Sequence, residues 1–171
     1  MTYVLKGLVG RGATWTSAFD ALSLPCRRLP IDAAGEPLFL VRPRALSEVD
    51  TMQMLDQMAR DDPELPSPFP ELAASATDDR PLAVAGAEFT GGTGFQWSAA
   101  WSRDRLLFGP LITATDPAEA EDERFVVVPP EGMAINRLLR WLGARARPGA
   151  DEFDTAGLGR SRGERDDPPV R

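Results

Sequence analysis

The stretch of sequence that decides the fold is residues 87–101, AEFTGGTGFQWSAAW. Two runs of aromatic and small residues flank a Gly-Gly-Thr-Gly segment, which is typical of two antiparallel strands joined by a tight turn. We expect strands over 82–90 and 95–102. A polar turn at 102–105 then leads into a third strand over 106–112. Together these segments predict an antiparallel β-meander.

The length of the turn determines which residues share a face, because a one-residue slip exchanges the two faces of a strand. A four-residue loop over 91–94 places Glu88 opposite Trp97 and leaves both faces mixed. A three-residue loop over 91–93 places all the large aromatic side chains on one face, above small alanines. Burial favours this second arrangement, and Gly94 suits the left-handed position of such a loop.

The three-residue loop also defines a candidate binding site on the opposite face of the hairpin. It pairs Glu88 with Gln96, near Ser98, and the nearest cations are Arg103 and Arg105 in the following turn. A lone carboxylate needs a second acid, a base or a metal for acid–base catalysis, and the sequence does not clearly supply one. The cluster is therefore either a polar contact site or a cross-strand pair without function.

The N-terminal half predicts a β-α-β-β-α segment. Apolar residues at helical spacing predict an amphipathic helix over 14–24, after a strand over 3–9. We further expect a short strand over 26–32, a strand over 37–42, a helix capped by Ser47 and extending past Met58, a Pro-rich acidic connector over 61–71, and a short helix within 72–80.

The C-terminal half predicts a closing helix and a tail. An acidic loop over 115–123 and an extended segment over 124–130 precede the helix, which we place at 131–145. Its buried stripe is Ile135, Leu138, Leu139 and Leu142, and Gly143 suits its end. Residues 144–171 hold six arginines, six acids and only three large apolar residues. We therefore predict one α+β domain over 1–143 and a flexible charged tail over 144–171.

The composition excludes several classes of chemistry. The chain has no histidine, so a Ser-His-Asp triad and a histidine-ligated metal are both excluded. A single cysteine, Cys26, excludes a disulfide framework and a cysteine zinc site. The net charge of −7 argues against nucleic acid as the main partner. No apolar run approaches the ~18 residues that span a bilayer, so we expect a cytoplasmic protein with no cofactor and no membrane.

The sequence offers three weaker candidate sites, and each has a simpler interpretation. Residues 7–14, GLVGRGAT, partly match a phosphate-binding loop, but Ala13 stands where the lysine is required. A ligand-free turn is favoured, with Arg11 and Gly12 as a weak anion site. The acidic pairs lack the spacing of a calcium loop. Cys26 precedes two arginines that would lower its pKa, but a half-buried, unreactive thiol is the favoured interpretation.

The hairpin resembles a known family. The box Glu88-Phe89-x-Gly-Gly-x-Gly-x-Gln96-x-x-Ala-x-Trp101, then LLFGPL and the helix INRLLRWLG, is similar to small uncharacterised proteins from GC-rich Gram-positive bacteria. The resemblance is good over 82–143 and loose over 1–143. Thr90 departs from it, because an aromatic residue is usual there. The resemblance implies a fold and no mechanism.

We expect a non-enzymatic, cytoplasmic, protein-binding module of the immunity or adaptor kind, whose partner is another protein; the acidic charge is compatible with a basic one. The acidic body and the missing catalytic residues favour it. The alternative is a small-molecule-binding protein or enzyme that uses a cleft around Glu88, Gln96 and an arginine. The sequence does not indicate the oligomeric state.

Overall fold

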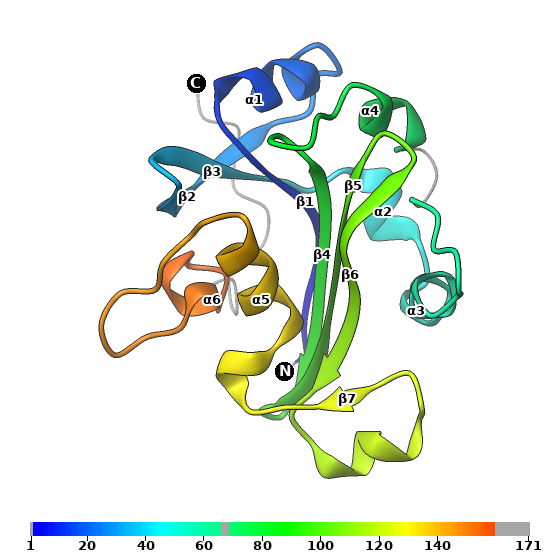
Figure 1. The fold of residues 1–171 in the computed structure, drawn as a ribbon. Helices are drawn as coiled ribbons and strands as arrows, with labels where there is room; N and C mark the ends of the chain where they lie inside the picture. Colours follow the sequence, from blue (N-terminus) through cyan, green and yellow to red (C-terminus); the bar gives the residue numbers. More distant parts are fainter. Residues whose placement is uncertain (1, 66–68, 160–171) are drawn as a thin grey trace.

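The computed structural model describes residues 2–65 and 69–159 (Figure 1). Within them, one seven-stranded sheet has the order β2-β3-β1-β4-β5-β6-β7. Neighbouring strands are antiparallel, except that β6 and β7 are parallel. The strands are β1 (Thr2–Arg11), β2 (Cys26–Ala33), β3 (Glu36–Val41), β4 (Leu82–Thr90), β5 (Thr93–Ser102), β6 (Arg105–Ala114) and β7 (Val126–Val127). The β4-β5-β6 meander is the one that the sequence predicts.

Helices cover both faces of this sheet, so the chain has the predicted α+β fold. The helices are α1 (Ala13–Asp20), α2 (Arg44–Glu48), α3 (Thr51–Met58), α4 (Pro70–Ala74), α5 (Ala134–Trp141) and α6 (Glu152–Thr155), with 3-10 turns η1 (Pro117–Glu121) and η2 (Pro130–Gly132). Figure 1 shows α5 and α6 on one side of the strands, and α2, α3 and α4 on the other.

The face covered by α5 and α6 is built from small sheet residues and a leucine-rich helix. Alternate residues of β4 are alanines on this face, which lets the helix approach the sheet closely. The predicted stripe of α5 is buried in full: Ile135, Leu138, Leu139 and Leu142. Gly143 ends the helix with φ +96, as the sequence predicts.

The opposite face carries the large aromatic residues of β5. Trp97 and Trp101 are both buried there, and the Nε1 of Trp101 donates to the carbonyl oxygen of Pro63 at 3.3 Å. Helix α3 contributes Met54 and Leu55 to the same core cluster. Met58 is buried as well, whereas Met52 on the same helix is 46% exposed.

The predicted hairpin register is wrong. Thr90 pairs with Thr93 and Glu88 pairs with Phe95, so the turn is the two-residue Gly91–Gly92 rather than a loop over 91–93. Gly91 and Gly92 have φ values of +63 and +99, the two left-handed positions that suit the twist of a tight hairpin. Phe89 consequently lies on the opposite face from the other hairpin aromatics.

Two physical reasons explain this register. The sheet is covered on both faces, so collecting every aromatic side chain on one face brings no advantage. The observed register also places the two strand glycines of the hairpin, Gly86 and Gly94, opposite Trp97 and Phe89. A Cβ on Gly86 would lie 2.0 Å from Cζ2 of Trp97, and one on Gly94 would lie 2.1 Å from the carbonyl oxygen of Glu88 and 2.6 Å from Cδ1 of Phe89. Glycine at these two positions therefore makes room for the rings.

The predicted flexible tail is wrong for residues 144–159. Ala144 forms a β-bridge with Ala33, and Phe153 and Leu158 are buried in the core cluster under α5. Asn136 on α5 holds this segment: its Nδ2 donates to Asp151 at 3.0 Å, and its Oδ1 accepts from the amide of Phe153 at 2.7 Å. A few apolar residues are enough to hold this segment in place, because the sheet and α5 already form the apolar surface against which they pack. The rest of the predicted tail, 160–171, lies outside the described residues.

Several predicted boundaries shift. The helix expected over 14–24 ends at Asp20, and the closing helix begins only at Ala134. The helix expected from Ser47 is divided into α2 and α3. The N-cap of α3 is Asp50, whose carboxylate accepts a hydrogen bond from the amide of Gln53 at 3.1 Å.

Candidate functional site

Gln96 and Ser98, two residues of the predicted site, are buried and fix the start of α5 on the sheet. The amide of Ile135 donates to Oε1 of Gln96 at 2.8 Å, and Ser98 Oγ donates to the carbonyl of Ala134 at 2.8 Å. Thr113 on β6 accepts from the amide of Ala134 at 2.8 Å. The first amides of a helix have no partner within the helix. Gln96 and Thr113 supply acceptors to two of them, so these polar side chains stabilise the fold.

Glu88 lies on the other face of the sheet. It is half-buried, and its cross-strand neighbours are Phe95 on β5 and Val4 on β1. No hydrogen bond or ion pair of its carboxylate is found within 2–65 and 69–159. The expected Glu88–Gln96 pair is therefore corrected, because the two-residue turn places these side chains on opposite faces. They cannot line one cleft.

The two arginines of the predicted site lie at the β5–β6 turn, at the opposite end of β5 from Phe95 and Glu88. Arg105 forms an exposed ion pair with Asp78. The hydrogen bond from Arg105, followed by one from Ser102, holds the pKa of the Asp78 carboxyl below its ordinary value. Arg103 has φ +58, and its amide donates to the carbonyl of Ala73 at 2.9 Å. Both arginines join the turn to the segment around α4.

The weak anion site at Arg11 and Gly12 receives a carboxylate from the chain itself. Oε2 of Glu36 lies 3.4 Å from Nε of Arg11, and its Oε1 lies 3.6 Å from Nη2 of Arg80. A Cβ on Gly12 would lie only 2.8 Å from that Oε1. Glu36 thus occupies the position beside the start of α1 where an external anion was expected. The two ion pairs join β1 and β3 to the segment before β4.

Cys26 is a half-buried thiol at the start of β2. Burial, and secondarily the charge of Asp20, raise its pKa to about 11. Its two arginine neighbours in sequence are exposed and do not offset this burial. The thiol is therefore protonated at neutral pH and a poor nucleophile.

Residues 2–65 and 69–159 contain no group of three acidic or cysteine side chains placed to hold a metal ion. The helices found in these residues are all too short or too polar to cross a bilayer.

One edge of the sheet exposes apolar side chains. β7 pairs with β6 only at Thr113 and Ala114, and no other described strand covers the outer edge of residues 105–112. Beside this edge, the ring of Phe108 on β6 lies 5.3 Å from that of Trp141 on α5, and Trp141 is 39% exposed. The half-buried Leu111 faces the same side, opposite Ser98. We call Phe108, Leu111 and Trp141 the β6-edge surface.

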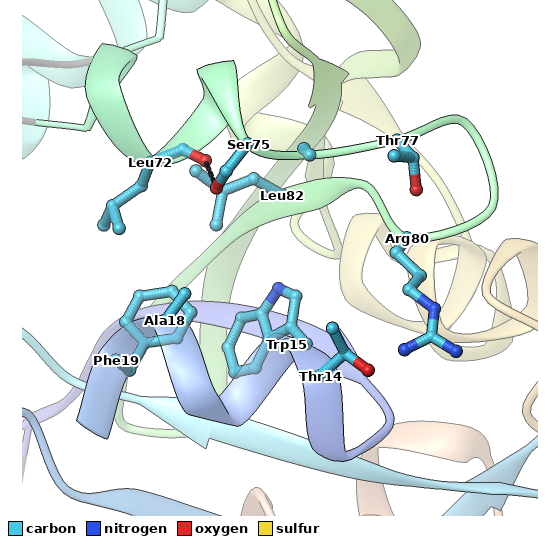
Figure 2. A pocket seen from close by; sticks show the side chains of 10 residues that line it. Thr14, Trp15, Ala18, Phe19, Leu72, Ser75, Thr77, Arg80 and Leu82 are labelled. Atoms are coloured by element: carbon cyan, nitrogen blue, oxygen red, sulfur yellow. Dashed lines mark hydrogen bonds between the residues drawn. The ribbon is translucent and has the colours of Figure 1, made fainter. Parts of the chain in front are cut away.

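A cavity of about 120 Å³ lies between α1 and the segment from α4 to the start of β4 (Figure 2). Trp15 and Phe19 of α1 form one wall, and Leu72 and Leu82 face them. Arg80 lies at one end. The cavity is independent of the predicted Glu88–Gln96 cluster, and none of that cluster's residues lines it.

Sequence reasoning missed both of these features for identifiable reasons. The α5 periodicity gave Trp141 no special role, and a strand edge is visible only once strand order is known. Trp15 was recognisable as a buried residue of an amphipathic helix, but the cavity beside it depends on where the segment around α4 packs, which the sequence does not indicate. Comparison with family models, with curated proteins and with solved structures found no match to this chain.

Proposed function

We propose that this chain is a non-enzymatic, cytoplasmic, protein-binding module of the immunity or adaptor kind, and that the β6-edge surface is its contact site. The exposed Trp141, whose ring packs at a tilt against Phe108 beside an open strand edge, is the observation that carries this proposal. Tryptophan is enriched among the residues that dominate binding energy at protein interfaces. A binding role is further supported by the position of Glu88 and Gln96 on opposite faces of the sheet, because the alternative enzymatic interpretation needs both in one cleft.

The shape of the edge favours recognition through side chains. Gly109, with φ +76, and Pro110 interrupt β6 at a register shift in its pairing with β5. Bulges and prolines are common means of protecting an edge strand against indiscriminate pairing. A partner would therefore insert an apolar side chain against Phe108 and Trp141, and any added strand would be short.

The charge of the chain favours a basic partner segment. The net charge is −7, and the segment joining β6 to β7 exposes Glu121 and Glu123. An extended segment with an apolar anchor and neighbouring lysines or arginines complements both features. Because exposed charges are screened by salt, its affinity should fall as ionic strength rises.

Selection of random linear peptides on the immobilised protein tests this proposal. We expect selected peptides to combine an apolar anchor with basic residues. Trp141→Ala should weaken the binding of these peptides by about 30-fold, equivalent to about 2 kcal/mol in binding free energy. Leu22→Ala is the matched control, because Leu22 is 53% exposed and lies outside the β6-edge surface. Failure to select any peptide, or equal binding to the Trp141→Ala protein, would contradict the proposal.

A further inference from the structure

The outer edge of the sheet at β2 carries a second surface feature, a groove lined by arginines. Among the described strands, β2 is the outermost at the end of the sheet opposite β6 and β7. Two adjoining hollows, of about 400 and 410 Å³, share residues 30–32 of β2. The first begins at Arg28, and the second reaches Arg145 and Arg147, in the segment between α5 and α6. We call residues 28–32, 145 and 147 the β2-edge groove.

The fold fixes the backbone that carries the last two of these arginines. Ala144 forms a β-bridge with Ala33 on β2, and the amide of Arg147 donates to Oγ1 of Thr155 on α6 at 3.0 Å. Arg145 and Arg147 both line the groove, whereas the residue between them does not. Residues two apart in an extended chain lie on one side of it, about 7 Å apart. The two guanidinium groups are therefore presented side by side from an anchored segment.

The groove is positively charged, although the whole chain carries −7. Arg145 and Arg147 are exposed and form no ion pair within residues 2–65 and 69–159. The third arginine, Arg28, lies 3.4 Å from Asp32, the one acidic residue that lines the groove. At physiological ionic strength, exposed charges more than about 8 Å apart are largely screened. A ligand in the groove is therefore attracted mainly by the two unpaired arginines.

The shape of the groove favours a peptide that is recognised through its side chains. The groove is open to solvent, whereas a site for a small molecule buries most of the ligand's surface. Pro30 has no N–H to pair with a partner strand, and the register between β2 and β3 shifts between Arg28 and Asp32. Both features hinder the addition of a strand along this edge. Clusters of arginines instead recognise acidic motifs through carboxylate contacts.

We propose that the β2-edge groove binds an acidic peptide segment in which two acidic residues are separated by one other residue. In an extended peptide these two side chains project to the same side, at the spacing of Arg145 and Arg147. Each carboxylate can then accept a pair of hydrogen bonds from one guanidinium group. Asp32 disfavours a third acidic residue farther along the groove. The site does not depend on the proposed function of the β6-edge surface, which takes a basic segment.

Isomeric peptides separate the spacing of the acids from their charge. The probes are Gly-Gly-Glu-Ser-Glu-Gly-Gly, its isomer Gly-Gly-Glu-Glu-Ser-Gly-Gly, and a neutral analogue of the first with glutamine at both acidic positions. Backbone amide shifts of the ¹⁵N-labelled full-length protein measure even weak dissociation constants. We expect the first peptide to move the amides of Arg145 and Arg147, and to bind at least about threefold more tightly than its isomer. The neutral analogue should leave these amides unmoved.

Single substitutions test the two arginines. Arg145→Gln and Arg147→Gln should each weaken the first peptide about fivefold, the upper end for an exposed ion pair. Arg27→Gln is the matched control, because Arg27 is exposed on β2, forms no ion pair among the described residues and does not line the groove. This control should bind the first peptide as the wild-type protein does.

Three results would overturn the proposal. Equal binding of the two isomers by the wild-type protein would reject the spacing. An equal loss of affinity in Arg27→Gln and Arg145→Gln would show that the overall charge, and not the groove, attracts the peptide. Amide shifts of Arg145 and Arg147 that depend on protein concentration without any peptide would reject a separate partner. They would assign the groove to a second copy, whose exposed Glu121 and Glu123 have the same spacing.

Discussion

Replacing Gly86 by alanine tests the hairpin register directly. The added Cβ would lie 2.0 Å from Cζ2 and 2.1 Å from Cε2 of Trp97. An ordinary carbon–carbon contact is about 3.5 Å, so the ring must move by about 1.5 Å. Trp97 is 1% exposed and packs near Phe95, with ring centroids 6.0 Å apart. Because a packed interior does not yield easily, we expect a loss of about 3 kcal/mol in the free energy of unfolding.

Urea unfolding, followed by tryptophan fluorescence, measures this loss through the transition midpoint at constant slope. In a Trp97→Leu background the cost of Gly86→Ala should fall by at least about 1 kcal/mol, because the obstructing ring is gone. The three-residue loop makes the opposite prediction. It would pair Gly86 with Ser98, and alanine in a strand would then stabilise the protein by about 0.5–1 kcal/mol. An unchanged or raised midpoint for Gly86→Ala would therefore refute the observed register.

Four further changes have defined outcomes. Gln96→Ala leaves the amide of Ile135 without its acceptor and should cost about 2 kcal/mol in urea unfolding; unaltered stability would show that the bond is dispensable. Alkylation of Cys26 by iodoacetamide should accelerate with pH up to a midpoint of about 11, and a plateau near pH 8.5, about the free-thiol value, would contradict the burial argument. The hydrogen bond from Arg124 lowers the pKa of Asp122 from 3.8 to about 2, so the interaction stabilises the fold above pH 3.8 and is lost as the pH falls toward 2. Arg124→Gln should return that pKa toward 3.8 in a carboxyl NMR titration, and an unmoved midpoint would exclude Arg124 as the cause. A chain that ends at Gly143 lacks the buried Phe153 and Leu158 and should lose at least about 3 kcal/mol, whereas one that ends at Gly159 keeps both; equal melting temperatures would restore the predicted domain boundary.

The sequence predicted the elements of the fold better than their pairing. The closing helix was found because its apolar residues recur at strict helical spacing, and all four of its predicted core residues are buried. The meander was found because turn residues separate three apolar runs. Its register was missed because only one face was assumed to be buried. The two glycine–aromatic pairs, Gly86 with Trp97 and Phe89 with Gly94, fit one register alone and could have identified it.

The candidate site was predicted less well, because a polar residue in a strand has the same appearance whether it binds a partner or a helix end. Gln96 and Ser98 looked like surface residues until the position of α5 was known. The segment 144–159 was missed for a related reason. Its composition is that of a disordered tail, but its few apolar residues enter a surface already formed by distant strands.

The hydroxyl of Tyr3 donates to the carbonyl of Leu158 at 2.6 Å, across 155 positions of the sequence. This contact has a consequence for biosynthesis. β1 is an interior strand whose partners, β3 and β4, are made after it, and, among the residues that the structure describes, helices after residue 133 cover its face toward α5. On the ribosome, the apolar side chains of Tyr3, Leu5 and Val9 therefore stay exposed until most of the chain has been synthesised. Such long-range closure slows folding and prolongs exposure of apolar surface, so we expect the nascent chain of this protein to depend on late residues to cover its first strand.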